Sequence, residues 1–355
     1  MAILTVAEYD HAEEEAICLL PNKVVEAFQP FAFAKTGYPF RISRDSALLK
    51  YVDVLHELRF ETIFSNMLGG GLTTKEFDLL KRLTTLVCNF SEIQFGQKSL
   101  AISALLRQFC TLRHIQYLCG NEHPSIFEFG PGSGYLGALL MLEGYPYAAT
   151  DVAQAFYLYQ NRLWDYITGK MNVNFSEWGS QTGQKELKNL LPGDVTHIPW
   201  WEFVKFNQVT LPTFGIVICN SALCEMSRFS LKFSLIISKM LLRMEAMNSQ
   251  LPIKAFVVEG WGAEWTNSIG SVGNTFNSLG YYQAFADHLI TVFLPEKNDE
   301  QSTIIQQSII NGRQAFEPLK TVGIDEVNQF YTELIGSKDH LNADEKFIKF
   351  IGEIV

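Results

Sequence analysis

SIFEFGPGSGYLGALLMLEGYPYAATD, residues Ser125–Asp151, is the stretch that decides the fold. A short apolar run in it ends with an acid at Glu128, and a helix-like apolar segment and a second apolar run then lead to another acid at Asp151. Alternating glycines follow the first acid, at Gly130, Gly132 and Gly134. The order predicts a strand, a tight loop, a helix and a second, parallel strand, because glycine adopts turn conformations that are costly for residues with side chains.

The same loop is the first candidate ligand site. Its backbone can approach a ligand closely, and the N-terminus of the following helix offers free N–H groups and the positive end of a helix dipole. The two acids lie 151 − 128 = 23 residues apart, which suits one strand–helix–strand unit with a ribose-binding acid after the loop. We therefore expect Glu128 and Asp151 to accept hydrogen bonds from ligand amine and hydroxyl groups.

The composition is that of an ordinary globular protein. Its 355 residues allow two or three domains, or one large α/β domain with an added piece. Apolar residues make up 47% of the chain, which is enough to fill a sizeable core. A net charge of −10 gives the chain as a whole no electrostatic reason to bind nucleic acid or an anionic membrane. We expect neither as a partner.

Cysteine usage and hydropathy predict a cytoplasmic protein. The six cysteines lie far apart in apolar surroundings, without a CxxC or Cys/His cluster, so we expect buried, reduced thiols. They are Cys18, Cys88, Cys110, Cys119, Cys219 and Cys224. The N-terminus lacks the pattern of a signal peptide, and no uncharged apolar run reaches the roughly 18 residues of a membrane span.

Residues 1–120 carry helical signals and almost no strand signals. A helical segment beginning near Asp45 is expected to stop at the glycines Gly69–Gly71. Thr73 with Glu76 matches a capping box that opens a second helix, and a third is expected at Ser99–Leu118. We expect residues 1–120 to form a helical cap over a catalytic domain of residues 121–355.

One loop of the cap differs from its neighbours. The segment Thr36–Ser43, TGYPFRIS, places a Gly-Tyr-Pro-Phe turn and Arg41 between helices. Loops carry function more often than regular elements do, so Tyr38 to Arg41 are candidates for touching the substrate. The alternative is a plain connector.

Beyond Asp151 the signals alternate between helix and strand. A helix is expected over DVAQAFYLYQNRLWDYI, followed by a polar loop at Thr168–Gly193 and a helix over LKFSLIISKMLLRMEAM. Buried strands are expected at Phe214–Cys219 and at Ala255–Val258, a helix at Thr275–Leu279, and HLITVFLP is strand-like. The alternation predicts an α/β fold with a doubly wound, mostly parallel Rossmann-like sheet. The tail from about Arg313 is expected to be helix and loop.

Two cofactor classes compete for the glycine loop. Gly132, Gly134 and Gly137 match the G-x-G-x-x-G fingerprint of dinucleotide-binding proteins. A carboxylate at Glu128 would face a pyrophosphate unfavourably, whereas it suits the cationic amino group of S-adenosylmethionine. That cofactor also offers a ribose diol to Asp151. The sequence therefore favours S-adenosylmethionine, with S-adenosylhomocysteine as the product.

The motif EFGPGSG resembles motif I of class I S-adenosylmethionine-dependent methyltransferases. More narrowly, the run EFGPGSGYLGALL…DVAQAFYLYQNRLW…HIPWWEF…CNSALCEM is similar to a bacterial sugar O-methyltransferase family, over roughly Ser125–Phe229. The resemblance implies a Rossmann-like methyltransferase fold. It also implies that the three loop glycines wrap the methionine end of the cofactor, that Glu128 lies beside its amino group and that Asp151 holds the ribose.

The resemblance further implies two groups of cofactor contacts at the strand ends. The segment His197–Trp201 would bracket adenine, and Trp200 could supply a stacking face or, equally, a hydrophobic plug. Asn220, after the fourth strand, would line the cofactor and the reacting centre, with a strand-end cap as the alternative.

Transfer of a methyl group to oxygen needs alignment and a base. Alignment contributes several kcal/mol, and a positioned base typically adds 10²–10⁴-fold. Candidate bases at the strand ends are Glu225, which is preferred, His197 and Glu259, each with a purely structural alternative. The sequence shows no metal-binding cluster.

The resulting hypothesis is an enzyme of the methyltransferase class that methylates a hydroxyl of a sugar or small metabolite. The alternatives are a protein or N-methyltransferase, an NAD-linked oxidoreductase and a non-catalytic scaffold with a vestigial pocket. The expected partner is a small-molecule or saccharide substrate, and a homodimer is left open.

Overall fold

A seven-stranded sheet organises the part of the chain that the computed structural model describes, which is residues 4–29, 39–53, 60–169, 190–206, 214–243, 253–262, 264 and 266–335. The strand order is β3-β2-β1-β4-β5-β7-β6. The strands are β1 (Ile126–Phe129), β2 (Tyr147–Asp151), β3 (Val195–Pro199), β4 (Ile216–Cys219), β5 (Ala255–Val258), β6 (Tyr282–Ala286) and β7 (Thr291–Leu294).

The direction of the strands defines where a ligand would bind. The first five strands are parallel, while β7 runs antiparallel between β5 and β6. The chain winds outward from β1 in one direction and from β4 in the other, so the strand order reverses between these two neighbours. In open α/β sheets such a reversal opens a crevice at the carboxyl ends of the strands.

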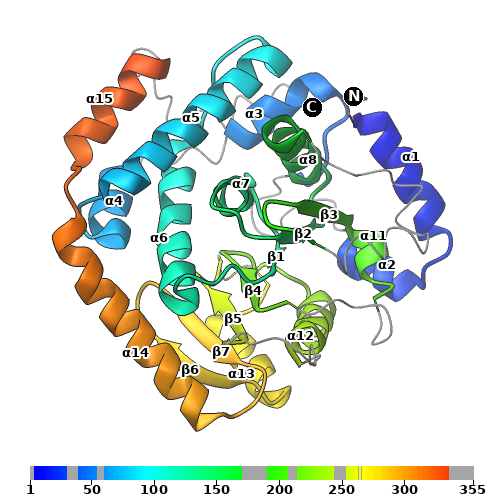
Figure 1. The fold of residues 1–355 in the computed structure, drawn as a ribbon. Helices are drawn as coiled ribbons and strands as arrows, with labels where there is room; N and C mark the ends of the chain where they lie inside the picture. The colour runs from blue at the N-terminus through cyan, green and yellow to red at the C-terminus, as the bar shows by residue number, and fades with distance from the viewer. Residues whose placement is uncertain are drawn as a thin grey trace.

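Helices cover both faces of the sheet (Figure 1). Before β1 the helices are α1 (Val6–Ile17), α2 (Asn22–Phe28), α3 (Leu48–Asp53), α4 (Phe60–Leu68), α5 (Thr74–Phe95) and α6 (Ile102–Cys119), with a 3-10 turn η1 (Asp45–Ala47). After β1 they are α7 (Tyr135–Leu142), α8 (Gln154–Thr168), α11 (Trp200–Phe203), α12 (Arg228–Arg243), α13 (Ile269–Ser278), α14 (Asp299–Phe316), η2 (Glu317–Leu319) and α15 (Ile324–Ile335). In the view of Figure 1, α6, α7 and α14 lie to one side of the strands, and α2, α11 and α12 lie to the other.

The fold class expected from the sequence is confirmed. The sheet is mostly parallel, with helices alternating between its strands. Thr73 and Glu76 form the expected capping box at the start of α5, where each side chain accepts a hydrogen bond from the other residue's backbone. The glycines Gly69–Gly71 follow the end of α4 as expected, because Gly69 and Gly70 adopt left-handed φ values.

Some boundaries differ from the expectation. The strand β6 was not expected from the sequence, and the helix expected at Thr275–Leu279 is the longer α13. β6 lies at the edge of the sheet, and only Ala284 of its five residues is buried, so it lacks the continuous buried run of a central strand. Most of the loop expected at Thr168–Gly193 lies outside the described residues.

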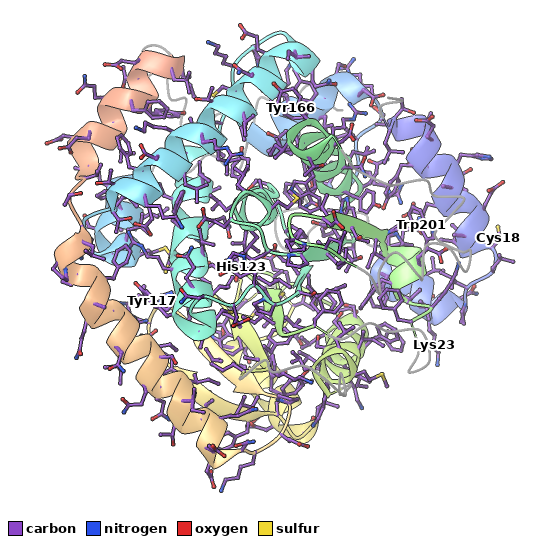
Figure 2. The ribbon with its side chains drawn as sticks, viewed as in Figure 1. Cys18, Lys23, Tyr117, His123, Tyr166 and Trp201 are labelled. Carbon is purple, nitrogen blue, oxygen red and sulfur yellow. The ribbon has the colours of Figure 1, made fainter. Side chains whose placement is uncertain are left out.

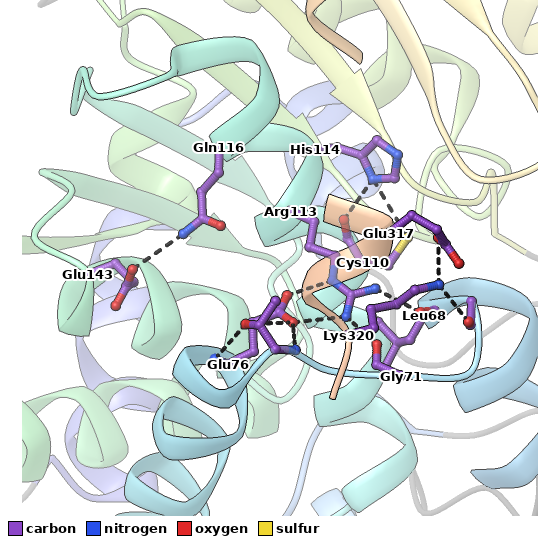
Figure 3. Close-up of polar contacts among 12 residues, drawn as sticks. Leu68, Gly71, Glu76, Cys110, Arg113, His114, Gln116, Glu143, Glu317 and Lys320 are labelled. Carbon is purple, nitrogen blue, oxygen red and sulfur yellow. Dashed lines mark hydrogen bonds and ion pairs between the residues drawn. The ribbon is translucent and has the colours of Figure 1, made fainter. Parts of the chain in front are cut away.

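Helix α6 is anchored through a buried ion pair (Figure 3). Arg113 donates to Glu76 at the start of α5, with Nε–Oε1 at 2.5 Å and Nη2–Oε2 at 2.9 Å. The same guanidinium donates to the carbonyl oxygens of Leu68, the last residue of α4, and of Gly71 just after that helix. One side chain therefore joins three helices of the N-terminal region.

The N-terminal helices also pack on the part of the chain that forms the sheet, and the domain boundary near residue 120 stays a prediction. The indole Nε1 of Trp200 in α11 donates to Glu13 Oε1 of α1 over 2.6 Å. The neighbouring Trp201 of α11 packs edge-on against Tyr9 of α1, and Figure 2 shows Trp201 pointing toward α1. Buried apolar residues from both regions form one continuous core.

The cysteines only partly meet the expectation. None of the six is paired in a disulfide, and four are buried, but Cys18 is exposed at the end of α1 (Figure 2). Cys119 is half-buried. Cys18 follows an amphipathic surface helix, whose end faces solvent. Among the described residues, no helix is long and apolar enough to cross a membrane.

Candidate functional site

The glycine loop after β1 has the backbone shape that its sequence predicts. Gly130, Gly132 and Gly134 have φ values of 62°, 57° and 73°, which are left-handed conformations that residues with a Cβ rarely adopt. A Cβ built on Gly132 would have no atom within 4 Å, whereas one on Gly130 would meet Ala222 after β4 at 3.5 Å. The middle of the loop therefore faces open space, and the loop lies beside the end of β4.

Two side chains of helix α8 hold this loop through hydrogen bonds to its carbonyl groups. Gln160 Nε2 donates to the carbonyl oxygen of Gly132 over 2.7 Å, and Trp164 Nε1 donates to that of Gly134 over 2.8 Å. Both residues come from the AFYLYQNRLW block, which the sequence analysis used only for the family resemblance. Sequence reasoning missed their role because no motif links a helix to a loop more than twenty residues before it.

Asp151, at the end of β2, lies next to the loop. Its Oδ1 accepts from the Ala153 N–H over 2.9 Å, and its Oδ2 accepts from Gln160 Nε2 over 2.8 Å. Burial raises the pKa of Asp151 to about 6, against the lowering effect of these hydrogen bonds. The expected ribose acid is thus beside the glycine loop and is linked to it through Gln160.

Glu128 lies deeper than the sequence suggested. Its carboxylate is fully buried, and Tyr147 donates its O–H to Glu128 Oε2 over 2.5 Å. Burial raises the pKa of Glu128 to about 8. At neutral pH the carboxyl group therefore carries little charge unless a cation is nearby. A mostly neutral Glu128 would repel a pyrophosphate less than the ionised carboxylate expected from the sequence.

The residues at the end of β3 are packed into the protein. His197 is fully buried, stacks on Tyr157 with ring centroids 3.6 Å apart, and has no hydrogen-bond partner for either nitrogen among the described residues. Burial lowers its pKa well below the usual value. Trp200 lies parallel to Phe28, with ring centroids 6.2 Å apart, and its N–H is bonded to Glu13. This geometry favours the plug over the adenine-stacking alternative for Trp200.

Asn220 follows β4 and ties three elements together. Its Nδ2 donates to Thr111 Oγ1 of α6 over 3.1 Å, and its Oδ1 accepts from the N–H of Glu259 after β5 over 3.1 Å. Of the two alternatives from the sequence, the hydrogen bonds favour the strand-end cap. In doing so they set the position of the β4 loop.

Arg107, Ser221 and Glu259 form a charged cluster at the ends of β4 and β5, of which only Glu259 was expected from the sequence. Arg107 of α6 places Nη2 2.7 Å from Ser221 Oγ and 3.2 Å from Glu259 Oε1. Ser221 has φ 54°, a left-handed value that is unusual for serine, and such strained residues gather at functional sites. Sequence reasoning found Glu259 but missed Arg107 and Ser221, since nothing local marks an arginine within an amphipathic helix.

The remaining candidates lie at the margin of the site. Glu225 is half-buried in the segment between β4 and α12, and its backbone N–H bonds to the Ala222 carbonyl. Arg41 pairs with Asp10 at 3.0 Å and with Glu13, both on α1, so its guanidinium has a structural role. Tyr38 lies outside the described residues. Among the described residues, no three His, Cys, Asp or Glu side chains gather in a way that could hold a metal ion.

No protein-family model and no curated protein matches the sequence. Solved structures with a similar arrangement include the PH0226 protein from Pyrococcus horikoshii OT3, at 11% identity and a TM-score of 0.34, over 56% of this chain and 92% of that chain. Another is magnesium protoporphyrin IX methyltransferase from Synechocystis PCC 6803 with bound SAM, at 12% identity and a TM-score of 0.32, over 62% and 91%. The CurJ carbon methyltransferase matches at 11% identity and a TM-score of 0.29, over 79% and 69%. Similarities this low transfer no activity to the chain.

Proposed function

We propose that the chain is an S-adenosylmethionine-dependent methyltransferase that methylates a hydroxyl group of a sugar or small metabolite. The observation that carries the proposal is the glycine loop after β1. Its three glycines have left-handed φ values, its middle faces open space, and Asp151 lies beside it where the strand order reverses. This is the place and the backbone shape that an adenosyl ligand requires.

The residues present fit the cofactor. Gly132, which has room on its open side, would accept the amino-acid end, and Asp151 would accept hydrogen bonds from the ribose diol. Glu128 is buried near the loop, and a cationic amino group would favour its ionised form. When bound, S-adenosylmethionine would supply a methyl group carried on a sulfonium. On methyl transfer the sulfonium sulfur is the leaving group and becomes a neutral thioether.

The chain's own part in the reaction is to position the acceptor and remove its proton. Of the candidate bases, His197 is enclosed and stacked, and Glu259 is held in an ion pair with Arg107. We therefore keep Glu225 as the proposed base. The Arg107–Glu259 pair would hold the β4 loop and orient the acceptor.

The NAD-linked alternative retains one supporting observation. A Cβ on Gly137 would come within 2.6 Å of the Tyr147 ring, so Gly137 permits the close helix–strand packing of a dinucleotide fingerprint. Against it stands the sheet. Dinucleotide-binding sheets have the strand order 3-2-1-4-5-6, whereas this sheet carries an antiparallel β7 between β5 and β6.

Calorimetry with S-adenosylmethionine, S-adenosylhomocysteine and NAD tests the proposal. Both sulfur cofactors should bind and NAD should not. Binding of NAD alone would overturn the proposal, and binding of none of the three would support the scaffold alternative. The acceptor can then be sought by incubating the protein with pooled metabolites and saccharides, using mass spectrometry to find a product that has gained one methyl group.

The base is tested with the acceptor that this search identifies. Glu225→Gln should reduce turnover by roughly 10²-fold or more, since a positioned base contributes that much, while the affinity for S-adenosylhomocysteine stays unchanged. Glu202→Gln, at a half-buried position of α11 where the carboxylate is paired with Lys205, is a matched control. Full turnover in Glu225→Gln would move the role of base to Glu259.

A further inference from the structure

Helix α8 presents two hydrogen-bond donors to the glycine loop from a single face. Gln160 and Trp164 are four residues apart, so their side chains are neighbours on the helix surface. Both are fully buried, and each donates to a loop carbonyl, those of Gly132 and Gly134. Gln160 also donates to Asp151, so one amide group links the loop to the acid of β2.

We propose that Gln160 and Trp164 are positioning residues that hold the glycine loop in its ligand-binding shape, and that they set the affinity for the amino-acid end of the cofactor. The inference rests on the proposed function. Its basis is the direction of the loop's peptide groups, which the two side chains determine.

The peptide after Gly132 shows the effect. Its carbonyl points toward α8 and is held by Gln160, and a trans peptide directs its N–H the opposite way. The N–H of Ser133 is thereby turned away from α8, and a Cβ on the neighbouring Gly132 would have no atom within 4 Å. A backbone N–H in that position suits a carboxylate, which is what the amino-acid end of the cofactor carries.

Close packing ties the two residues to the loop glycines. A Cβ on Gly134 would lie 3.0 Å from Gln160 Cγ and 3.1 Å from Trp164 Nε1. Gly134 is therefore needed both for its φ value and because the two side chains occupy the space of a Cβ. Ordinary core packing would explain the burial of a tryptophan, but it does not explain two directed hydrogen bonds to the loop carbonyls of Gly132 and Gly134.

Calorimetry of the full-length protein with S-adenosylhomocysteine and with adenosine tests the inference. Gln160→Met keeps the length of the side chain and removes its donor, and Trp164→Phe keeps an aromatic ring without the N–H. Each should weaken S-adenosylhomocysteine roughly tenfold. Trp164→Phe should leave adenosine within about twofold of wild type, because the loop contacts only the amino-acid end.

Matched controls remove the same kind of hydrogen bond elsewhere. Gln306→Met breaks a bond from Nε2 to the Ala284 carbonyl, and Tyr281→Phe breaks one from a buried hydroxyl to the Leu235 carbonyl. Tyr281→Phe should lower the melting temperature about as much as Trp164→Phe does, whereas Gln306→Met should lower it less than Gln160→Met because Gln306 is exposed. Both controls should leave the affinity for S-adenosylhomocysteine unchanged. A loss of affinity in the controls equal to that in the test variants would overturn the inference.

The pH profile gives a second readout that loss of packing would not move. The hydrogen bond from Gln160 lowers the pKa of Asp151, so Gln160→Met should shift the acid limb of S-adenosylhomocysteine binding to higher pH, and Gln306→Met should not. Other titrating groups also feel the charge of Asp151, namely Glu128 of β1, Tyr147 of β2, Cys219 of β4 and Tyr9 of α1.

Two results would count against the inference in different ways. If the wild type does not bind S-adenosylhomocysteine, the proposed function and the inference both fall. If the wild type binds it and both variants bind it equally well, only the positioning role is refuted. Should Gln160→Met not fold, Trp164→Phe decides alone by its ratio of S-adenosylhomocysteine to adenosine affinity.

Discussion

At the scale of single residues, the two acids of the site differ in what they can do. Asp151 accepts hydrogen bonds from Gln160 and from the Ala153 backbone that compensate for its burial, whereas Glu128 accepts one within the described part of the chain, from Tyr147. Accordingly, burial raises the pKa of Asp151 to about 6 and that of Glu128 to about 8. Glu128 is therefore the more costly carboxylate to ionise within the fold.

Replacing Glu128 by Gln should change how stability depends on pH. The unfolded chain loses this proton near pH 4.5, and the folded chain keeps it until about pH 8. Because the folded state binds more protons in that window, wild-type stability falls as pH rises through it. Glu128→Gln has no such loss, and it should be more stable than wild type above pH 8 by an amount on the order of a few kcal/mol.

Urea denaturation at about pH 5 and about pH 9 measures the difference. The two proteins should be close in stability at the lower pH and separate at the higher one. Gln can still accept the hydrogen bond from Tyr147, so a change in packing should be small. Equal pH slopes for the two proteins would show that Glu128 titrates normally.

At the scale of elements, α7 sits close to β2 only because Gly137 lacks a side chain. A Cβ there would meet Tyr147 Cε1 at 2.6 Å and Trp164 Cζ2 at 2.9 Å. Both rings are buried in the core, so neither can move aside cheaply. The packing of this one helix thus depends on residues from β2 and α8.

Gly137→Ala should destabilise the protein by roughly 1–3 kcal/mol, because it overpacks a filled interior. Gly273→Ala is the matched control. Gly273 lies inside α13, where a Cβ would have no atom within 4 Å, so the same change should stabilise by about 0.5–1 kcal/mol through the lower entropy of the unfolded chain. Thermal unfolding of both variants checks the opposite signs. A stabilising Gly137→Ala would show that α7 is free to shift.

At the scale of the whole molecule, α6 connects distant parts of the chain. Arg107 reaches Glu259 at the site, and Arg113 reaches the ends of α4 and α5. His114 accepts at Nε2 from Arg313 of α14 over 2.7 Å, and Arg313 in turn donates to Asp287 between β6 and β7. Burial lowers the pKa of His114 to about 4, so it stays neutral and can accept this bond.

Arg113→Leu should therefore destabilise the whole fold, not a single helix. The side chain of Arg113 is only 6% exposed and that of Glu76 only 9%, and removing one partner leaves a buried charge unpaired. Such a loss costs roughly 3–5 kcal/mol. Lys81→Met, which breaks an exposed pair with Asp78, should cost less than about 1 kcal/mol. Similar losses in the two variants, measured by chemical denaturation, would argue against a central role for Arg113.

The sequence predicted more of the fold than of the site. Apolar periodicity and turn residues located β1, β2, β4 and β5, the capping box of α5 and the glycine loop, because these signals are local. The edge strand β6 was missed, since its residues show no continuous apolar run. Among the site residues, Arg107, Ser221, Gln160 and Trp164 carry no local motif.

By itself, then, the sequence determined the fold class, the loop glycines and the two acids, because strand, turn and helix preferences act over a few residues. Only the tertiary structure decided that Glu128 is buried against Tyr147, that Trp200 is bonded to α1 and that Asn220 is a tie between strands. It also decided that α8 holds the loop. These outcomes depend on which segments meet across the sheet, and burial and hydrogen bonding between segments distant in sequence are set by packing that no local pattern records.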